Sequence, residues 1–167
     1  MIVADATPLL HLARSGHLDL LRSLYARVVV PPSVWEETGG RGEPRPESHS
    51  LQEASAKWIV VKTLSARDRT RSEAFRRGAP LGRGEADAIA LAEGLRTAVL
   101  MDDRVGIDLA RIRGIETRWT TSVVLEARQR NILDRKAAGR AIEDLVASGL
   151  WIRQDVLVRI LAILGER

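Results

Sequence analysis

The sequence predicts an α/β protein, a three-layer α/β/α sandwich with a central, mostly parallel sheet, and two observations lead to this class. Short apolar runs, such as residues 28–30 (VVV) and 97–101 (TAVLM), are typical of strands that are buried on both faces. Longer segments with apolar residues at helical spacing lie between these runs. Strand and helix therefore alternate along the 167 residues, as they do in parallel sheets covered by helices.

The predicted strands are short, and the third is expected at the edge of the sheet. They cover residues 2–5, 28–30, 58–61, 97–101 and 116–119. Helices are predicted after each strand, bounded by capping residues, Pro and Gly, over 7–16, 17–25, 33–38, 50–57, 65–80, 81–95, 103–113 and 120–131, with two more within 134–164. A loop rich in Gly, Pro and Ser is expected over residues 39–50.

The chain is expected to form one α/β domain over residues 1–130, with helices 131–167 packed on the same domain as an extension. No apolar stretch is long enough to cross a bilayer, and the first residues lack the basic start of an export signal. We therefore expect a cytoplasmic protein without membrane contact. The net charge of +4 weakly favours nucleic acid as a partner, although a high arginine content has other origins.

Acidic side chains stand at the carboxyl ends of predicted strands and near the starts of predicted helices. Ligands of open parallel sheets bind beyond the carboxyl ends of the strands. The acids in question are Asp5, Glu36, Glu37, Glu85, Asp87, Asp102 and Asp103. Four separate segments are therefore expected to bring carboxylates to one edge of the sheet.

Each acid also has an ordinary structural interpretation. Asp5 can cap the helix that follows it. Glu36 and Glu37 diverge by about 100° on a helix, so that one of them is expected to face solvent. Glu85 can be a first-turn acid favoured by the helix dipole. Asp87 lies beside the apolar stripe of its helix, where an unpaired carboxylate is unfavourable, which makes it the better ligand of the two.

A cluster of carboxylates repels itself unless a cation neutralises it. The sequence has no cysteine, and its three histidines are scattered, which argues against a zinc site and excludes cysteine nucleophiles and disulfides. Oxygen ligands alone select hard cations. We therefore expect Mg²⁺ or Mn²⁺ as the cofactor, with the number of ions, one or two, left open.

Four segments resemble PIN-domain proteins, and most closely a branch near the VapC-type toxins of prokaryotic toxin–antitoxin pairs. The segments are MIVADATPLLHLARSGHLDLLRSL, VVVPPSVWEE, LGRGEADAIALA and VLMDDR, and the resemblance runs from residue 1 to about residue 130. PIN domains are α/β/α sandwiches whose acids hold Mg²⁺ or Mn²⁺ and hydrolyse RNA phosphodiester bonds. The resemblance implies the same fold and the same chemistry here.

Carried over position by position, the resemblance implies a set of site residues. The catalytic acids would be Asp5, Glu37, Asp87 and Asp103, and the metal ligands would be Asp5, Asp87 and Asp103 with Asp102 and Glu85. Met101 stands where related toxins carry a hydroxyl residue, which leaves open whether Asp102 or Asp103 is the direct ligand.

Further residues are expected at the mouth of the site. The resemblance implies Thr7 and Thr121, which match hydroxyl residues near the metal. Separately, the arginines Arg104 and Arg83 are expected to contact the RNA backbone, and Arg104 has the alternative of pairing with its acidic neighbours. The function implied is a metal-dependent endoribonuclease, the toxin of a toxin–antitoxin pair, with RNA as substrate. A small antitoxin protein and a second copy of the chain are the expected protein partners. The alternative is a catalytically silent PIN-like module that acts by binding protein or nucleic acid.

Overall fold

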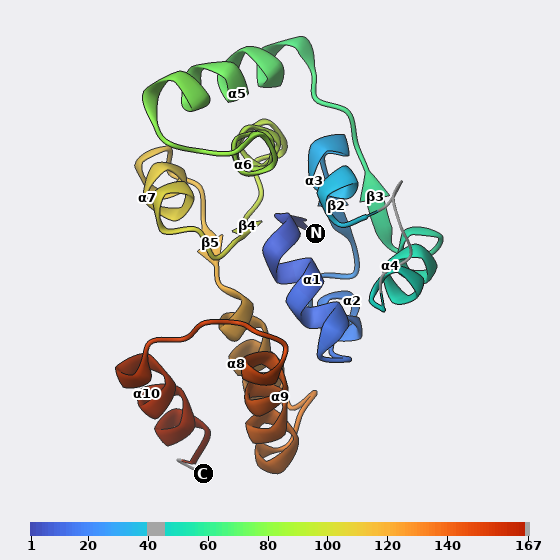
Figure 1. Ribbon diagram of the computed structural model, residues 1–167, viewed down its shortest axis with the longest axis vertical. Coiled ribbons are helices and arrows are strands. Elements are labelled where there is room, and N and C mark those ends of the chain that lie inside the picture. Colours follow the sequence, from blue (N-terminus) through green and yellow to red (C-terminus); the bar gives the residue numbers. More distant parts are fainter. Residues whose placement is uncertain (40–45, 166–167) are drawn as a thin grey trace.

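The computed structural model describes residues 1–39 and 46–165, and it contains one five-stranded sheet in which all strands are parallel (Figure 1). The strand order is β3-β2-β1-β4-β5. The strands are β1 (Ile2–Ala4), β2 (Val28–Val30), β3 (Ile59–Val61), β4 (Val99–Leu100) and β5 (Thr117–Arg118). The α/β fold and all five predicted strands are thereby confirmed, with β3 at an edge as expected. Most strands are shorter than predicted, and Trp58 precedes β3 instead of belonging to it.

Ten helices occupy the described residues and connect or follow the strands. They are α1 (Ala6–Arg14), α2 (Asp19–Tyr25), α3 (Pro32–Glu37), α4 (Ser48–Ser55), α5 (Ala66–Gly78), α6 (Arg83–Leu95), α7 (Arg104–Ile112), α8 (Thr120–Gln129), α9 (Arg135–Ala147) and α10 (Gln154–Gly165). Helix α4 begins inside the predicted loop 39–50, because its buried Leu51 and Ala54 pack into the core. The central part of that loop, residues 40–45, lies outside the described residues.

The helices lie on both sides of the strands. In Figure 1, α5, α6 and α7 lie above the strands, and α1, α2, α8 and α9 lie below them. Helix α6 packs against β1 and β4, and α5 packs on α6. The alanine-rich sequence of α6 permits this position between the sheet and α5, since Ala86, Ala88 and Ala90 are fully buried and small enough for close packing on more than one side of the helix.

The topology brings the ends of β1 and β4 together, although they are almost a hundred residues apart in sequence. Ala4 is the register partner of Leu100, and the Asp5 backbone N–H donates to the Leu100 carbonyl at 2.9 Å. Residues that follow these two strands are therefore neighbours at the carboxyl edge of the sheet. This arrangement places Asp5 beside the segment that contains Asp102 and Asp103.

Helices α9 and α10 pack on each other and on α8. Their buried side chains, such as Ile142, Leu145 and Ile160, belong to the same hydrophobic cluster as the strands. The C-terminal helices thus share one core with the α/β part, and the division at residue 130 stays a prediction. Among the described residues, no helix is both long enough and apolar enough to cross a membrane.

Candidate active site

Asp5 is the most deeply buried acid at the carboxyl edge of the sheet, with only 3% of its surface exposed. It occupies the N-cap position of α1, but its side chain forms no capping hydrogen bond. Its Oδ1 atom has no hydrogen-bond partner among the described residues. The structure therefore does not explain Asp5 as a helix cap, which was its alternative interpretation.

The electrostatic surroundings of Asp5 are unfavourable for a charged carboxylate. Burial is the main cause that raises the pKa of Asp5 from 3.8 to about 7; the backbone N–H of Ala6 lowers this pKa, and the negative charges of Glu85, Glu37 and Asp102 raise it. These three acids come from α6, α3 and the end of β4, which are far apart in sequence. Three of the other acids identified in the sequence therefore lie within electrostatic reach of Asp5.

Glu37 lies against the first turn of α6. Its pKa is raised because its carboxylate is partly buried, and the backbone N–H of Gly84 opposes that effect by hydrogen bonding. A Cβ atom at residue 84 would lie 2.6 Å from Glu37 Oε1 and 2.7 Å from Oε2. Only glycine at this position leaves room for the carboxylate. The residues Glu36 and Glu37 are both exposed overall, although the Glu37 carboxylate is partly covered, and Glu36 is not among the charges that act on Asp5.

Glu85 and Asp87 lie in the first two turns of α6 and serve different local purposes. Glu85 closes a capping box, because its Oε2 accepts a hydrogen bond of 2.7 Å from the Gly82 backbone N–H. Asp87 accepts hydrogen bonds from two serine hydroxyls, from Ser33 at 2.6 Å and from Ser72 at 2.5 Å. The two serines tie both oxygens of Asp87 to α3 and α5.

Asp102 and Asp103, adjacent in sequence, point to different partners. Asp102 accepts hydrogen bonds from the Thr120 backbone N–H at 2.9 Å and from its hydroxyl at 2.5 Å. Burial raises the pKa of Asp102, and the bonds from Thr120 oppose that effect. Asp103 caps α7 by accepting a bond of 2.7 Å from the Gly106 backbone N–H. Of the two, Asp102 is the one that acts on Asp5 electrostatically.

The other residues expected at the mouth of the site make few contacts. Thr7 and Arg104 are exposed at the starts of α1 and α7, where no described residue binds their side chains. Thr121 is partly buried, whereas its neighbour Thr120 is fully buried and carries the bond to Asp102. The position of the bonded hydroxyl is therefore one residue before the one that the sequence suggested.

Four residues of the site were not identified from the sequence, namely Ser33, Ser72, Thr120 and His11. The serines and Thr120 form the hydrogen bonds described above. His11 lies near Asp102, and burial lowers its pKa although the charge of Asp102 opposes this. Its Nδ1 is 2.9 Å from the Ser148 hydroxyl. None of these contacts leaves a local signal, because each joins segments that only the fold brings together.

The residues present fit a divalent cation in chemistry, although not as a preformed cage. Among the residues that the structure describes, no three His, Asp or Glu side chains are grouped so as to hold a metal ion. Two features nevertheless suit a cation: the unbonded Oδ1 of Asp5 and the repulsion that Glu85, Glu37 and Asp102 exert on the Asp5 carboxylate. A divalent ion would give the Oδ1 atom of Asp5 a partner and would neutralise the repulsion between the acids.

The sequence profile of the PIN-domain family matches residues 1–166. No curated protein matches the chain. The matched region includes all the strands, the acids of the carboxyl edge and the C-terminal helices described above. PIN domains are generally nucleases that depend on divalent metals. The parallel sheet, the acids that converge on Asp5 and the matching profile together show that the chain belongs to the PIN-domain family.

Proposed function

We propose that the protein is a metal-dependent endoribonuclease that hydrolyses RNA phosphodiester bonds at the site around Asp5. The single observation that carries this proposal is Asp5 itself: a buried carboxylate with an unbonded oxygen and three acidic neighbours. Such an arrangement destabilises a protein when no cation neutralises it, and it is therefore typical of functional sites. The PIN-domain family supplies a use of the required kind, since its acids serve metal-dependent phosphodiester cleavage.

Asp5 and Asp102 are the residues we propose as principal ligands, with Glu37 and Glu85 completing the site. These residues would hold Mg²⁺ or Mn²⁺, which when bound would lower the pKa of a water molecule and offset charge on the departing oxygen. Glu37 is exposed and has a raised pKa, which suits it to accept the proton of the attacking water. The water oxygen then bonds to phosphorus, the bond to the leaving oxygen breaks, and solvent protonates that oxygen.

Asp87 and Asp103 have supporting roles in this proposal. Asp87 is held by Ser33 and Ser72, so that it fixes α6 between α3 and α5 and adds negative charge beside Glu37. Asp103 caps α7 and thereby sets the path of the chain directly after Asp102. The sequence assigned direct roles to both residues, and those roles stay predictions.

The biological role we propose is that of the toxin in a toxin–antitoxin pair, acting in the cytoplasm. Helix α10 supports a protein partner, because it exposes the apolar side chains of Val158, Leu161 and Ile163. A second copy of the chain and a small antitoxin both stay predictions. Gel filtration of the isolated protein checks the first: a monomer at high micromolar concentration contradicts a homodimer.

A second function, a catalytically silent binding module, is favoured by one specific observation. The described residues contain no group of three side chains that could hold a metal ion as they stand. Calorimetric titration with Mn²⁺ separates the two proposals, with the wild-type protein compared with the Asp87→Ala and Asp5→Ala variants. If the protein is a nuclease, we expect the wild type to bind Mn²⁺ and the Asp5→Ala variant to lose this binding. If it is a silent module, none of the three proteins should bind Mn²⁺.

Cleavage of a labelled RNA by the purified protein tests the nuclease proposal. We expect Mg²⁺- or Mn²⁺-dependent cleavage by the wild type and a loss of at least 100-fold in Asp5→Asn. Asp108→Asn is the matched control, since Asp108 is exposed on α7 and makes no described contact with the site. Equal cleavage by wild type and Asp5→Asn, with metal-free reactions silent, contradicts the assignment.

A further inference from the structure

We propose that a phosphate of the RNA strand, next to the one that is cleaved, binds in a cavity between α3, α5 and α6. This inference rests on the proposed ribonuclease function and adds a substrate-binding site to it. The cavity measures about 260 Å³ and adjoins Asp87. Three arginines and three hydroxyl residues contribute to its lining: Arg69, Arg76, Arg83, Ser33, Thr63 and Ser72.

The cavity is tied directly to the acidic site. Ser72 lies between Arg69 and Arg76 on α5, three residues after one and four before the other, so that all three share one face of the helix. The hydroxyl of Ser72 donates to Asp87, and the hydroxyl of Ser33 donates to the other oxygen of the same carboxylate. The face of α5 that carries the arginines is therefore held beside the acids of α6.

Two arginines of this cavity have guanidinium groups available for a phosphate. Arg76 is exposed and has no hydrogen-bond or ion-pair partner among the described residues. Arg69 donates only from Nη1, at 2.7 Å, to the Leu64 carbonyl. Arg83 is 65% exposed, but its Nε pairs with Asp87 Oδ2 at 3.7 Å, so it adds positive charge to the cavity and is not counted as a free phosphate ligand. Guanidinium groups bind phosphate oxygens through paired N–H donors, which suits this arrangement.

One acid, Glu73, also lines the cavity, but it does not neutralise the arginines. Glu73 is exposed on α5 and forms no ion pair with Arg69 or Arg76 in the described part of the chain. With Asp87 included, the lining carries three positive and two negative side chains. The cavity therefore has a positive excess and borders the acidic site. An RNA strand needs an anchor at this position, because the acids themselves repel its phosphates.

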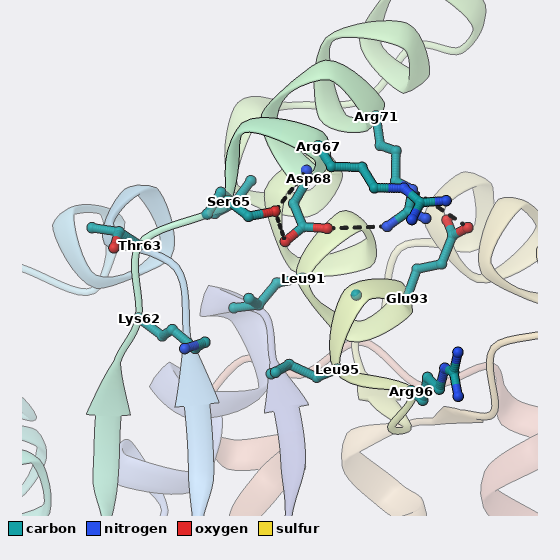
Figure 2. Close-up of a pocket in the computed structure, with 12 residues that line it drawn as sticks. Lys62, Thr63, Ser65, Arg67, Asp68, Arg71, Leu91, Glu93, Leu95 and Arg96 are labelled. Carbon is teal, nitrogen blue, oxygen red and sulfur yellow. Dashed lines mark hydrogen bonds and ion pairs between the residues drawn. The ribbon is translucent and has the colours of Figure 1, made fainter.

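A neighbouring cavity of about 510 Å³ is less suited to hold a phosphate (Figure 2). Its Arg71 is already paired within the protein, with Asp68 at 3.0 Å and with Glu93 at 3.7 Å. The two cavities share Thr63, next to Lys62 in Figure 2. An RNA strand that leaves the 260 Å³ cavity over Thr63 would next meet the positive charge of Lys62. We therefore propose that the strand runs from the acids towards Lys62.

Binding of a fluorescent single-stranded RNA, measured by anisotropy in EDTA over a range of salt concentrations, tests the inference without cleavage. We expect the Arg69→Ala/Arg76→Ala variant to bind at least 10-fold more weakly than the wild type. The slope of log Kd against log salt should fall by about 0.7 for each phosphate of the single strand that the variant no longer neutralises. The matched control is Arg140→Ala/Arg159→Ala, which removes the same charge from exposed positions on α9 and α10.

The comparison with the control decides the inference. Binding by the Arg69/Arg76 variant within 2-fold of the control variant overturns it. Because Arg69 also bonds to the backbone, Arg76→Gln is tested separately: Arg76 has no partner among the described residues, so weaker binding by this variant reflects the RNA. Weaker binding without any metal-dependent cleavage by the wild type would retain the phosphate site and reject the ribonuclease. Metal-dependent cleavage by the wild type, with an unchanged KM in the Arg69→Ala/Arg76→Ala and Arg76→Gln variants, would retain the ribonuclease and reject the phosphate site.

Discussion

Replacing Asp5 by asparagine should stabilise the metal-free protein above neutral pH, and this effect is large enough to measure. The carboxyl group is buried, with a pKa raised from 3.8 to about 7 by burial and by neighbouring acids. An acid whose pKa is higher in the folded state holds its proton more tightly when folded. The stability that it contributes is present below pH 3.8 and is lost as the pH rises through 7.

The size of this difference in stability follows from the shift in the pKa of Asp5. A difference of about 3 pH units corresponds to about 4 kcal/mol, at 1.36 kcal/mol for each unit. Because asparagine must place its own amide in the same pocket, we expect a gain of roughly 2–4 kcal/mol at pH 8, and much less at pH 4. Other acids titrate in both proteins and largely cancel in the difference.

Urea unfolding followed by circular dichroism, in EDTA and at pH values from 4 to 8.5, measures this difference. The stability advantage of Asp5→Asn should grow across the range and level off near pH 8. Addition of Mg²⁺ or Mn²⁺ at pH 8 should stabilise the wild type more than the variant, because an ion that binds only the folded state raises its stability. Parallel pH profiles, with the variant less stable throughout, would refute the reasoning.

Three further predictions concern the same site. Gly84→Ala should reduce cleavage at least 10-fold, with unfolding changed by only about 1 kcal/mol, because the new Cβ displaces the flexible end of Glu37; single-turnover kinetics and urea unfolding check both. Thr120→Val removes the hydroxyl bond to Asp102, so the acidic limb of the pH–rate profile should move to higher pH; an unchanged limb contradicts the role of that bond. EDTA should abolish cleavage, and Mg²⁺ or Mn²⁺ should restore it, whereas full activity in EDTA excludes a metal-dependent reaction.

The fold was predictable from the sequence because its signals are local. The run VVV and the segment TAVLM each indicated a strand, and the glycines near residues 16 and 94 marked helix ends. Strand limits were less accurate, since the ends of short strands depend on which neighbours bond to them. Thr117–Arg118, for instance, pairs only with β4 among the described strands.

The site was predictable as a set of acids but not in its detail. The position of an acid after a strand indicates the edge of the sheet, and this applies equally to Asp102 and Asp103. Their difference depends on Thr120, which the fold brings to Asp102 from 18 residues away. Similarly, the bonds of Ser72 and Ser33 to Asp87 join three helices. Contacts of this kind require the tertiary structure.

The central claim is that acids from separate segments form one cation site at Asp5. Diffraction from crystals soaked in Mn²⁺, with anomalous scattering recorded, tests it most directly. We expect an anomalous peak within bonding distance of the unbonded Oδ1 of Asp5, and its loss in crystals of Asp5→Asn. A well-ordered wild-type structure with no peak at Asp5, or with Mn²⁺ bound only elsewhere, would contradict it.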